Sequence, residues 1–199
     1  MIRKIIIIFF SLFYFIQSPV FSYSSNPKEF VKELVDDAIN QLSDKNLTKE
    51  EKSKFIEKVA IENVDINALG LYTLGELRKS SEKEDILNYQ KSFEKYFLKS
   101  FSSRLAEYTN PEIDVLNKEI LSENYTIVNS ILIGTSERPE VKIDWRIYTK
   151  NPDNPLIRDL IIEGLSLART QKEEFASILN SNDGDINFLF KSLDEFSKN

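Results

Sequence analysis

The spacing of apolar residues changes at Pro111, and this change limits the possible folds more than any other feature of the chain. Before Pro111, apolar side chains recur every three or four residues, which is the period of one helix face. After it they alternate with polar side chains, which is the period of a strand with one buried face. Near residue 169 the helical period returns. Helices, then consecutive strands, then helices predict an α+β protein.

Residues that can cap a first turn mark the expected helix starts before Pro111. They lie at Asn26-Pro27, Thr48, Asp65 and Ser81. The last of these opens the longest helix, which must end before Pro111 because a proline ring cannot continue the helical ladder. One face of that helix is apolar throughout and carries Ile86, Tyr89, Phe93, Phe97, Phe101, Leu105 and Tyr108.

Four strands are expected after Pro111, over 113–121, 125–133, 141–148 and 157–167. The third alternates most clearly. Its apolar face carries Val141, Ile143, Trp145 and Ile147, and its polar face carries Lys142, Asp144, Arg146 and Tyr148. The connections between the later strands are too short for parallel crossovers, so the sheet is predicted to be antiparallel. Two closing helices are expected over 169–181 and 184–196.

Residues 1–22 have the order of a secretory leader. Arg3 and Lys4 precede a short apolar run, and small residues suit the −3 and −1 positions of a cut after Ser22, with Ser24 as the second candidate. The run is shorter than the ~20 residues that a membrane span needs, so an uncleaved anchor is the weaker alternative. We expect one mature domain over 23–199 in the periplasm, where an exported chain without cysteine fits.

The composition removes several classes of enzyme. The chain has no His and no Cys, so a Ser-His-Asp triad and a thiol nucleophile are both impossible. Its 26 Lys+Arg against 32 Asp+Glu argue against nucleic acid as a partner, since a nucleic-acid binder needs a basic surface. A hydrolase that uses only carboxylates, such as Asp144, Asp159 and Glu163 on the expected strands, is a weak alternative.

The content of 14 Phe and 8 Tyr suggests a different kind of function. A long helix that lies across a curved sheet, with its aromatic face towards Ile143, Trp145 and Ile147, can leave an apolar cavity. Such a cavity would bind apolar ligands. The alternative is a filled core, as expected of a structural or adhesion module.

Several segments together resemble the MlaC family of periplasmic phospholipid-binding proteins, also called toluene-tolerance or organic-solvent-resistance auxiliary proteins. The most specific segment is Asp159 to Ser166, which is similar to the family's Asp-Val-x-(Val/Ile)-Glu-Gly-(Val/Ile)-Ser stretch. The others are Asn26-Pro27, Phe30-Val31, Leu74-Gly75, Arg78, Phe93, Phe97, Tyr108, Phe175 and Gly184-Asp185-Ile186 with Leu193. Departures from the family pattern occur at Leu77, Phe101 and Pro155-Leu156, and none of them adds charge to the expected cavity.

The resemblance implies a cystatin-like or nuclear-transport-factor-like fold, in which helices pack on one curved four-stranded antiparallel sheet. It also implies a soluble phospholipid carrier, not an enzyme, that maintains the lipid asymmetry of the outer membrane. The implied protein partners are an outer-membrane lipoprotein–porin complex and an inner-membrane ABC transporter complex. We expect a monomer that needs no metal or cofactor and holds phospholipid as cargo.

Face and motif position together select the residues expected to line the lipid cavity. These are Leu69, Tyr72, Phe97, Phe101, Leu105, Val128, Ile143, Trp145, Ile147, Ile162 and Leu165. Asp159 and Glu163 are interpreted as structural or capping groups near the last strand.

Overall fold

The computed structural model describes residues 23–106, 111–136 and 138–198. The expected leader and Tyr108 lie outside these ranges. The helices are α1 (Pro27–Ser43), α2 (Lys49–Asn63), α3 (Ile66–Thr73), the short 3-10 helix η1 (Gly75–Lys79), α4 (Lys83–Leu105), α5 (Leu167–Asn180) and α6 (Ile186–Lys198). The strands are β1 (Ile113–Ser122), β2 (Tyr125–Leu132), β3 (Val141–Tyr148), β4 (Leu156–Ile162) and β5 (Leu165–Ser166).

Three of the expected caps begin their helices. The Asn26 side chain accepts from the Lys28 N–H at the start of α1, and the Asp65 side chain accepts from the Ala68 N–H at the start of α3. Thr48 forms a full capping box at the start of α2. Each cap satisfies a backbone donor that has no partner within its own helix.

The five strands form one antiparallel sheet in sequence order, from β1 to β5. The α+β class with a single antiparallel sheet is therefore confirmed. The prediction of one last strand over 157–167 is wrong. The chain turns at Glu163 and Gly164, whose φ angles of 49° and 81° cannot belong to a strand, and the segment becomes two strands instead.

Neighbouring strands keep the alternation of β3 in register, so the sheet has two distinct faces. Val128, Trp145 and Leu160 lie opposite one another on one face, here called the Trp145 face. Ile127, Arg146 and Asp159 lie opposite one another on the other, here called the Arg146 face. The two faces have different neighbours.

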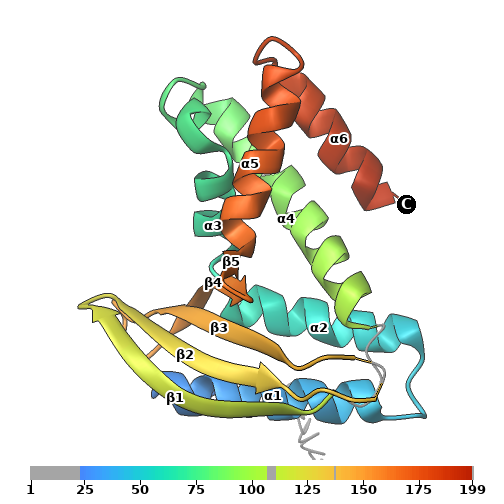
Figure 1. The fold of residues 1–199 in the computed structure, drawn as a ribbon. Helices are drawn as coiled ribbons and strands as arrows, with labels where there is room; N and C mark the ends of the chain where they lie inside the picture. Colours follow the sequence, from blue (N-terminus) through green and yellow to red (C-terminus); the bar gives the residue numbers. More distant parts are fainter. Residues whose placement is uncertain (1–22, 107–110, 137, 199) are drawn as a thin grey trace, which may run out of the picture.

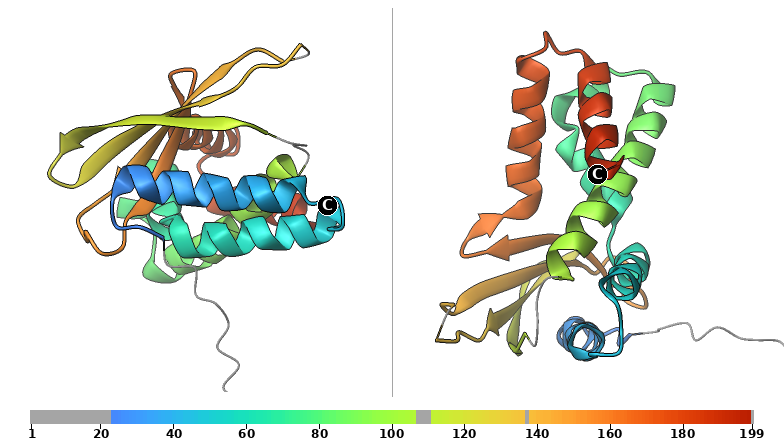
Figure 2. Two further views of the ribbon diagram at one scale, coloured as in Figure 1. Left: turned by 90° about the horizontal axis from the view of Figure 1, so that it is seen from below. Right: turned by 90° about the vertical axis from the view of Figure 1, so that its right-hand side faces the viewer.

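On the Trp145 face the sheet packs against α1, and α2 runs beside α1 (Figure 2) and adds Val59 and Ala60 to the same buried cluster. Phe30 and Val31 of α1 belong to the same buried cluster as Val128, Trp145 and Ile147 of the sheet. Trp145 also donates its indole N–H to Ser130 Oγ at 2.8 Å, so its polar atom is satisfied inside the core. This face is therefore packed as a core.

The long helix α4 does not lie across the sheet as expected. It packs against α2, α3 and α6, and Figure 1 shows α3 to α6 rising from the sheet on the side away from α1. The aromatic face of α4 meets other helices: Tyr89 lies 6.5 Å from Phe175 of α5 and 6.4 Å from Phe190 of α6, between ring centroids. Aromatic pairs at such distances stabilise the contact between these helices. No helix within the described ranges is long and apolar enough to cross a membrane.

Candidate binding cavity

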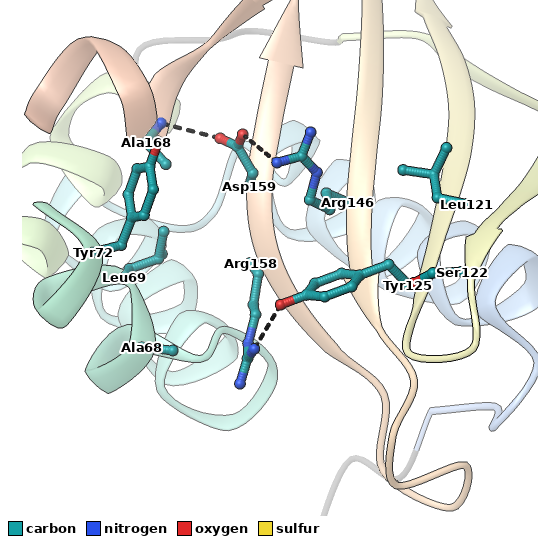
Figure 3. Close-up of a pocket in the computed structure, with 10 residues that line it drawn as sticks. All are labelled: Ala68, Leu69, Tyr72, Leu121, Ser122, Tyr125, Arg146, Arg158, Asp159 and Ala168. Carbon is teal, nitrogen blue, oxygen red and sulfur yellow. Dashed lines mark hydrogen bonds and ion pairs between the residues drawn. The ribbon is translucent and has the colours of Figure 1, made fainter.

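A cavity of about 520 Å³ lies on the Arg146 face, between the sheet, α3 and the start of α5 (Figure 3). This volume falls in the ~300–1,000 Å³ range of small-molecule ligand sites. Ten residues line the cavity: Ala68, Leu69, Tyr72, Leu121, Ser122, Tyr125, Arg146, Arg158, Asp159 and Ala168.

The apolar part of the lining comes from two sides. Leu69 and Tyr72 project from α3, and Leu121 projects from the end of β1 near the turn into β2. Tyr72 and Leu121 are 39% and 50% exposed, so large apolar groups are accessible to solvent at this site. Exposed apolar groups around a cavity are typical of ligand-binding surfaces.

A register shift between β3 and β4 sets the polar part of the lining. Ile157 lies opposite Ile147 and Asp159 lies opposite Arg146, so Arg158 is the extra residue of a bulge. Regular alternation would place Arg158 and Asp159 on opposite faces, whereas both line this cavity.

Arg158 is fully engaged by neighbouring residues. Its Nε and Nη2 atoms donate to Asp65 Oδ2 at 2.9 and 2.7 Å, and its Nη1 atom donates to the Tyr125 hydroxyl at 2.7 Å. The guanidinium also stacks on the ring of Tyr148 at 3.5 Å. Burial lowers the pKa of Arg158, but the hydrogen bonds to Asp65 and Tyr125 outweigh that effect and raise it. Arg158 therefore ties α3 to the sheet as a permanent cation.

Asp159 is a structural acceptor at the start of α5. It is only 4% exposed, and its two oxygens accept from the Ser166 hydroxyl at 2.6 Å and from the Ala168 N–H at 3.0 Å. Ser166 in turn accepts from the Arg169 N–H and caps α5. The segment 159–166 thus encodes a strand, a tight turn and a helix cap, and the interpretation of Asp159 as a capping group is confirmed.

The carboxylates considered for catalysis do not form a convergent pair. Asp144 accepts from the Asn129 side chain at 2.7 Å, and Glu163 accepts from the backbone N–H of Lys142. Asp159 is bound as described above. None of the three presents an unengaged carboxylate to another across the cavity, which is the arrangement that glycoside hydrolysis needs.

Arg146 differs from Arg158 because its guanidinium N–H groups make no hydrogen bond to other described residues. Its Nη1 atom lies 3.8 Å from Asp159 Oδ2, which is too long for a hydrogen bond. Its Nε atom is buried and has no hydrogen-bond partner among the described residues. Figure 3 shows the side chain between Asp159 and Leu121, on the sheet side of the cavity.

The structure places two of the expected lining residues, Leu69 and Tyr72, in this cavity. Val128, Trp145 and Ile147 are instead buried in the core on the opposite sheet face. The expectation that the hollow lies on the Trp145 face is therefore corrected for these three residues, because α1 and α2 fill that side. Arg146 is not among the lining residues expected from the sequence, although the alternation of β3 places it on the other face.

The remaining expected residues lie outside this cavity. Leu165 is exposed at the surface. The others are only partly buried and belong to α4 or to the Trp145 face of β3 and β4: Phe97, Phe101, Leu105, Ile143 and Ile162. Phe97 stacks on Phe101 with ring centroids 5.5 Å apart. Their contact with lipid stays a prediction.

The described residues contain no group of three or more acidic side chains that could hold a metal ion.

The family model described as "MlaC protein" matches residues 32–195. Among solved structures, the chain is similar to the phospholipid-binding protein from Ralstonia solanacearum, whose structure was determined in complex with a phospholipid. The identity is 21%, the TM-score is 0.68, and the match covers 84% of this chain and 94% of that one. This likeness shows a shared fold. No curated protein matches the sequence.

Proposed function

This chain belongs to the MlaC family, and on that basis we propose that it is a soluble phospholipid carrier of the periplasm. It carries lipid between an outer-membrane lipoprotein–porin complex and an inner-membrane ABC transporter complex, and so maintains the lipid asymmetry of the outer membrane. The family match across 32–195 is the observation that carries the proposal. The solved Ralstonia solanacearum protein, which shares the fold, holds a phospholipid and supports it.

The accessible apolar surface of the chain supports lipid as cargo. Leu69, Tyr72 and Leu121 form an apolar wall around a hollow, and further aromatic side chains on α4 are only partly buried. Two acyl chains of ~15 methylenes each would cost ~24 kcal/mol to place in water. A protein surface that keeps even part of each chain dry lowers this barrier substantially.

The carrier needs no chemical step of its own. Moving an acyl chain from a bilayer to an apolar protein site exchanges one apolar environment for another, so the transfer is close to neutral in free energy. The direction of transport must then come from the partner complexes. We accordingly assign no enzymatic activity and no cofactor to this chain, which acts as a monomer with phospholipid as its cargo.

Lipid extraction tests the proposal directly. The protein is purified from the periplasmic fraction of bacteria that express the full chain, extracted with organic solvent and analysed by mass spectrometry. We expect diacyl phospholipid at close to one molecule per protein. A delipidated sample incubated with phospholipid vesicles should recover it. If neither sample contains stoichiometric lipid, the carrier proposal is wrong, and recovery of the protein only from the cytoplasm would overturn the localisation.

A further inference from the structure

We propose that Arg146 binds the anionic phosphate group of the lipid headgroup, and that the carrier therefore selects phosphate-bearing lipids over uncharged diacyl lipids. This inference rests on the proposed carrier function and assigns one end of the cargo to a place in the cavity. The argument has three parts: unused donors on Arg146, a neighbouring carboxylate that is already engaged elsewhere, and an apolar wall in the same cavity.

The unused donors are the first part. A guanidinium offers five N–H donors in a planar fork that matches the oxygens of a phosphate. Arg158 uses three of its nitrogens on Asp65 and Tyr125, whereas no hydrogen bond of Arg146 fixes it among the described residues. A buried donor without an acceptor is costly, and a ligand oxygen would supply the missing one. Arg146 is therefore the cation in this cavity that is available to a ligand.

The engagement of Asp159 is the second part. Two arginines and one carboxylate, Asp159, line the cavity. Asp159 accepts from Ser166 and from the backbone of Ala168, and it stays 3.8 Å from Arg146. The charge of Arg158 is paired with Asp65 at 2.7 Å. Each guanidinium thus has one carboxylate nearby, but Asp159 already accepts two shorter hydrogen bonds, so Arg146 keeps its donors for the oxygens of an anionic ligand.

The apolar wall is the third part. Leu69, Tyr72 and Leu121 line the same cavity as Arg146, so a molecule bound here meets a cation and an apolar surface together. A small free anion would leave this wall exposed to water, whereas an amphiphile covers it. The volume of about 520 Å³ suits a drug-sized ligand, so the cavity holds the headgroup and the adjoining part of a diacyl lipid.

The test compares three ligands that share parts of one structure. Phosphatidylglycerol carries acyl chains and a phosphate, diacylglycerol with the same chains lacks the phosphate, and glycerol phosphate lacks the chains. The full-length wild-type protein is compared with Arg146→Gln, which removes the charge, and with Arg146→Lys, which retains it. Arg169→Gln is the matched control, because Arg169 is an exposed cation of α5 that pairs with Glu173 and does not line the cavity.

Loss of charge-assisted hydrogen bonds to the phosphate should weaken the binding of phosphatidylglycerol by Arg146→Gln at least about tenfold. Diacylglycerol binding should not change, Arg146→Lys should retain most of the affinity, and Arg169→Gln should match the wild type. Wild-type protein alone should prefer phosphatidylglycerol to diacylglycerol, and this preference should fall as salt is raised. The wild-type comparison decides the question even if Arg146→Gln does not fold.

Three results would overturn the inference. In the first, Arg146→Gln weakens both diacyl lipids equally or neither of them. In the second, glycerol phosphate binds as tightly as the intact lipid, which would make this a site for free phosphate esters. In the third, the wild type binds both lipids equally. Each of these leaves lipid carriage intact, whereas failure of the wild type to bind any diacyl lipid defeats the carrier proposal itself.

Discussion

The guanidinium of Arg158 lies 3.5 Å from the ring centroid of Tyr148 and at the same time pairs with Asp65, which caps α3. One side chain thus links the sheet to the helix that carries Leu69 and Tyr72 of the apolar wall. The side chains of Arg158 and Asp65 are only 25% and 19% exposed, so water compensates little for the loss of either. The geometry of the cavity depends on this link.

We predict that Arg158→Leu lowers the free energy of unfolding by about 2–3 kcal/mol, because it leaves Asp65 and the Tyr125 hydroxyl without their partner in a partly buried site. Urea unfolding followed by circular dichroism measures the loss. Lys54→Met is the control, since Lys54 pairs with Glu50 on an exposed helix surface, where water compensates for the lost partner, and this variant should unfold at nearly the same urea concentration as the wild type. Equal losses in the two variants would contradict a special role for Arg158.

The stability of the protein at alkaline pH tests the burial of Tyr89. Burial raises the pKa of its hydroxyl well above the ordinary value near 10, and the hydrogen bond with Thr73 opposes this only in part. The folded state therefore holds the proton at a pH where the unfolded state releases it. The contribution of Tyr89 to the free energy of unfolding is therefore fully present below about pH 10 and is lost as the pH rises further.

Tyr89→Phe should accordingly flatten the fall in the free energy of unfolding above pH 10. Near pH 7 it should cost about 1 kcal/mol, because the buried hydrogen bond between Tyr89 and Thr73 is lost. Tyr23, whose pKa is raised by burial and by Asp37, remains in the variant and should preserve part of the slope. Urea unfolding between pH 8 and 11.5 gives the free energy of unfolding of the wild type and of Tyr89→Phe. If the two plots of this free energy against pH are parallel, Tyr89 does not cause the loss of stability at alkaline pH.

The turn between β4 and β5 gives a third prediction. Gly164 has a φ of 81°, and a Cβ added there would meet no atom within 4 Å. Gly164→Ala should therefore cost about 1–2 kcal/mol through backbone strain alone, without any clash. Ala176→Gly, on the exposed surface of α5, is a control that should cost about 1 kcal/mol through helix propensity, without altering the turn.

Thermal unfolding and amide exchange separate these two glycine-related effects. Gly164→Ala should speed exchange at the start of α5, because the turn positions Ser166 and Asp159 for the cap. Ala176→Gly should leave exchange at that cap unchanged. Unaltered exchange in Gly164→Ala would show that the cap forms without help from the turn.

Local signals in the sequence predicted most of the elements but not how they meet. The caps at Asn26, Thr48 and Asp65 and the alternation of β3 each depend on neighbouring residues, and each is present as expected. The split at Gly164 was missed because Asp159 to Leu167 reads as a continuous apolar strand. The sequence could have indicated it only through a glycine that follows a polar residue.

The cavity was harder to predict because it depends on tertiary packing. Alternation correctly separated Trp145 from Arg146, but it does not say which face helices will cover. The bulge that brings both Arg158 and Asp159 to the cavity breaks the alternation and has no signal in spacing. The pattern therefore favours the apolar face as the site, whereas the structure fills much of that face with α1 and α2 and leaves a hollow beside Arg146.

The acyl chains can contact either the apolar wall of the cavity or the partly buried aromatic side chains of α4, and substitutions that introduce a charge distinguish these two surfaces. Tyr72 is 39% exposed in the cavity wall, so Tyr72→Asp should fold normally. A carboxylate placed against an acyl chain is strongly unfavourable, and the recovery of phospholipid from vesicles should fall at least about tenfold. Leu87→Asp is the matched control, because Leu87 is 48% exposed on α4 and does not line the cavity.

Phe101→Asp provides the opposing test, since Phe101 is partly buried on α4 outside this cavity. If the acyl chains lie along Leu69, Tyr72 and Leu121, this variant should retain more lipid than Tyr72→Asp, provided that thermal unfolding shows it to be folded. The ratio of extracted lipid to protein, measured by mass spectrometry for all three variants, gives the comparison. Loss of lipid in Phe101→Asp with full retention in Tyr72→Asp would place the chains on the α4 side instead.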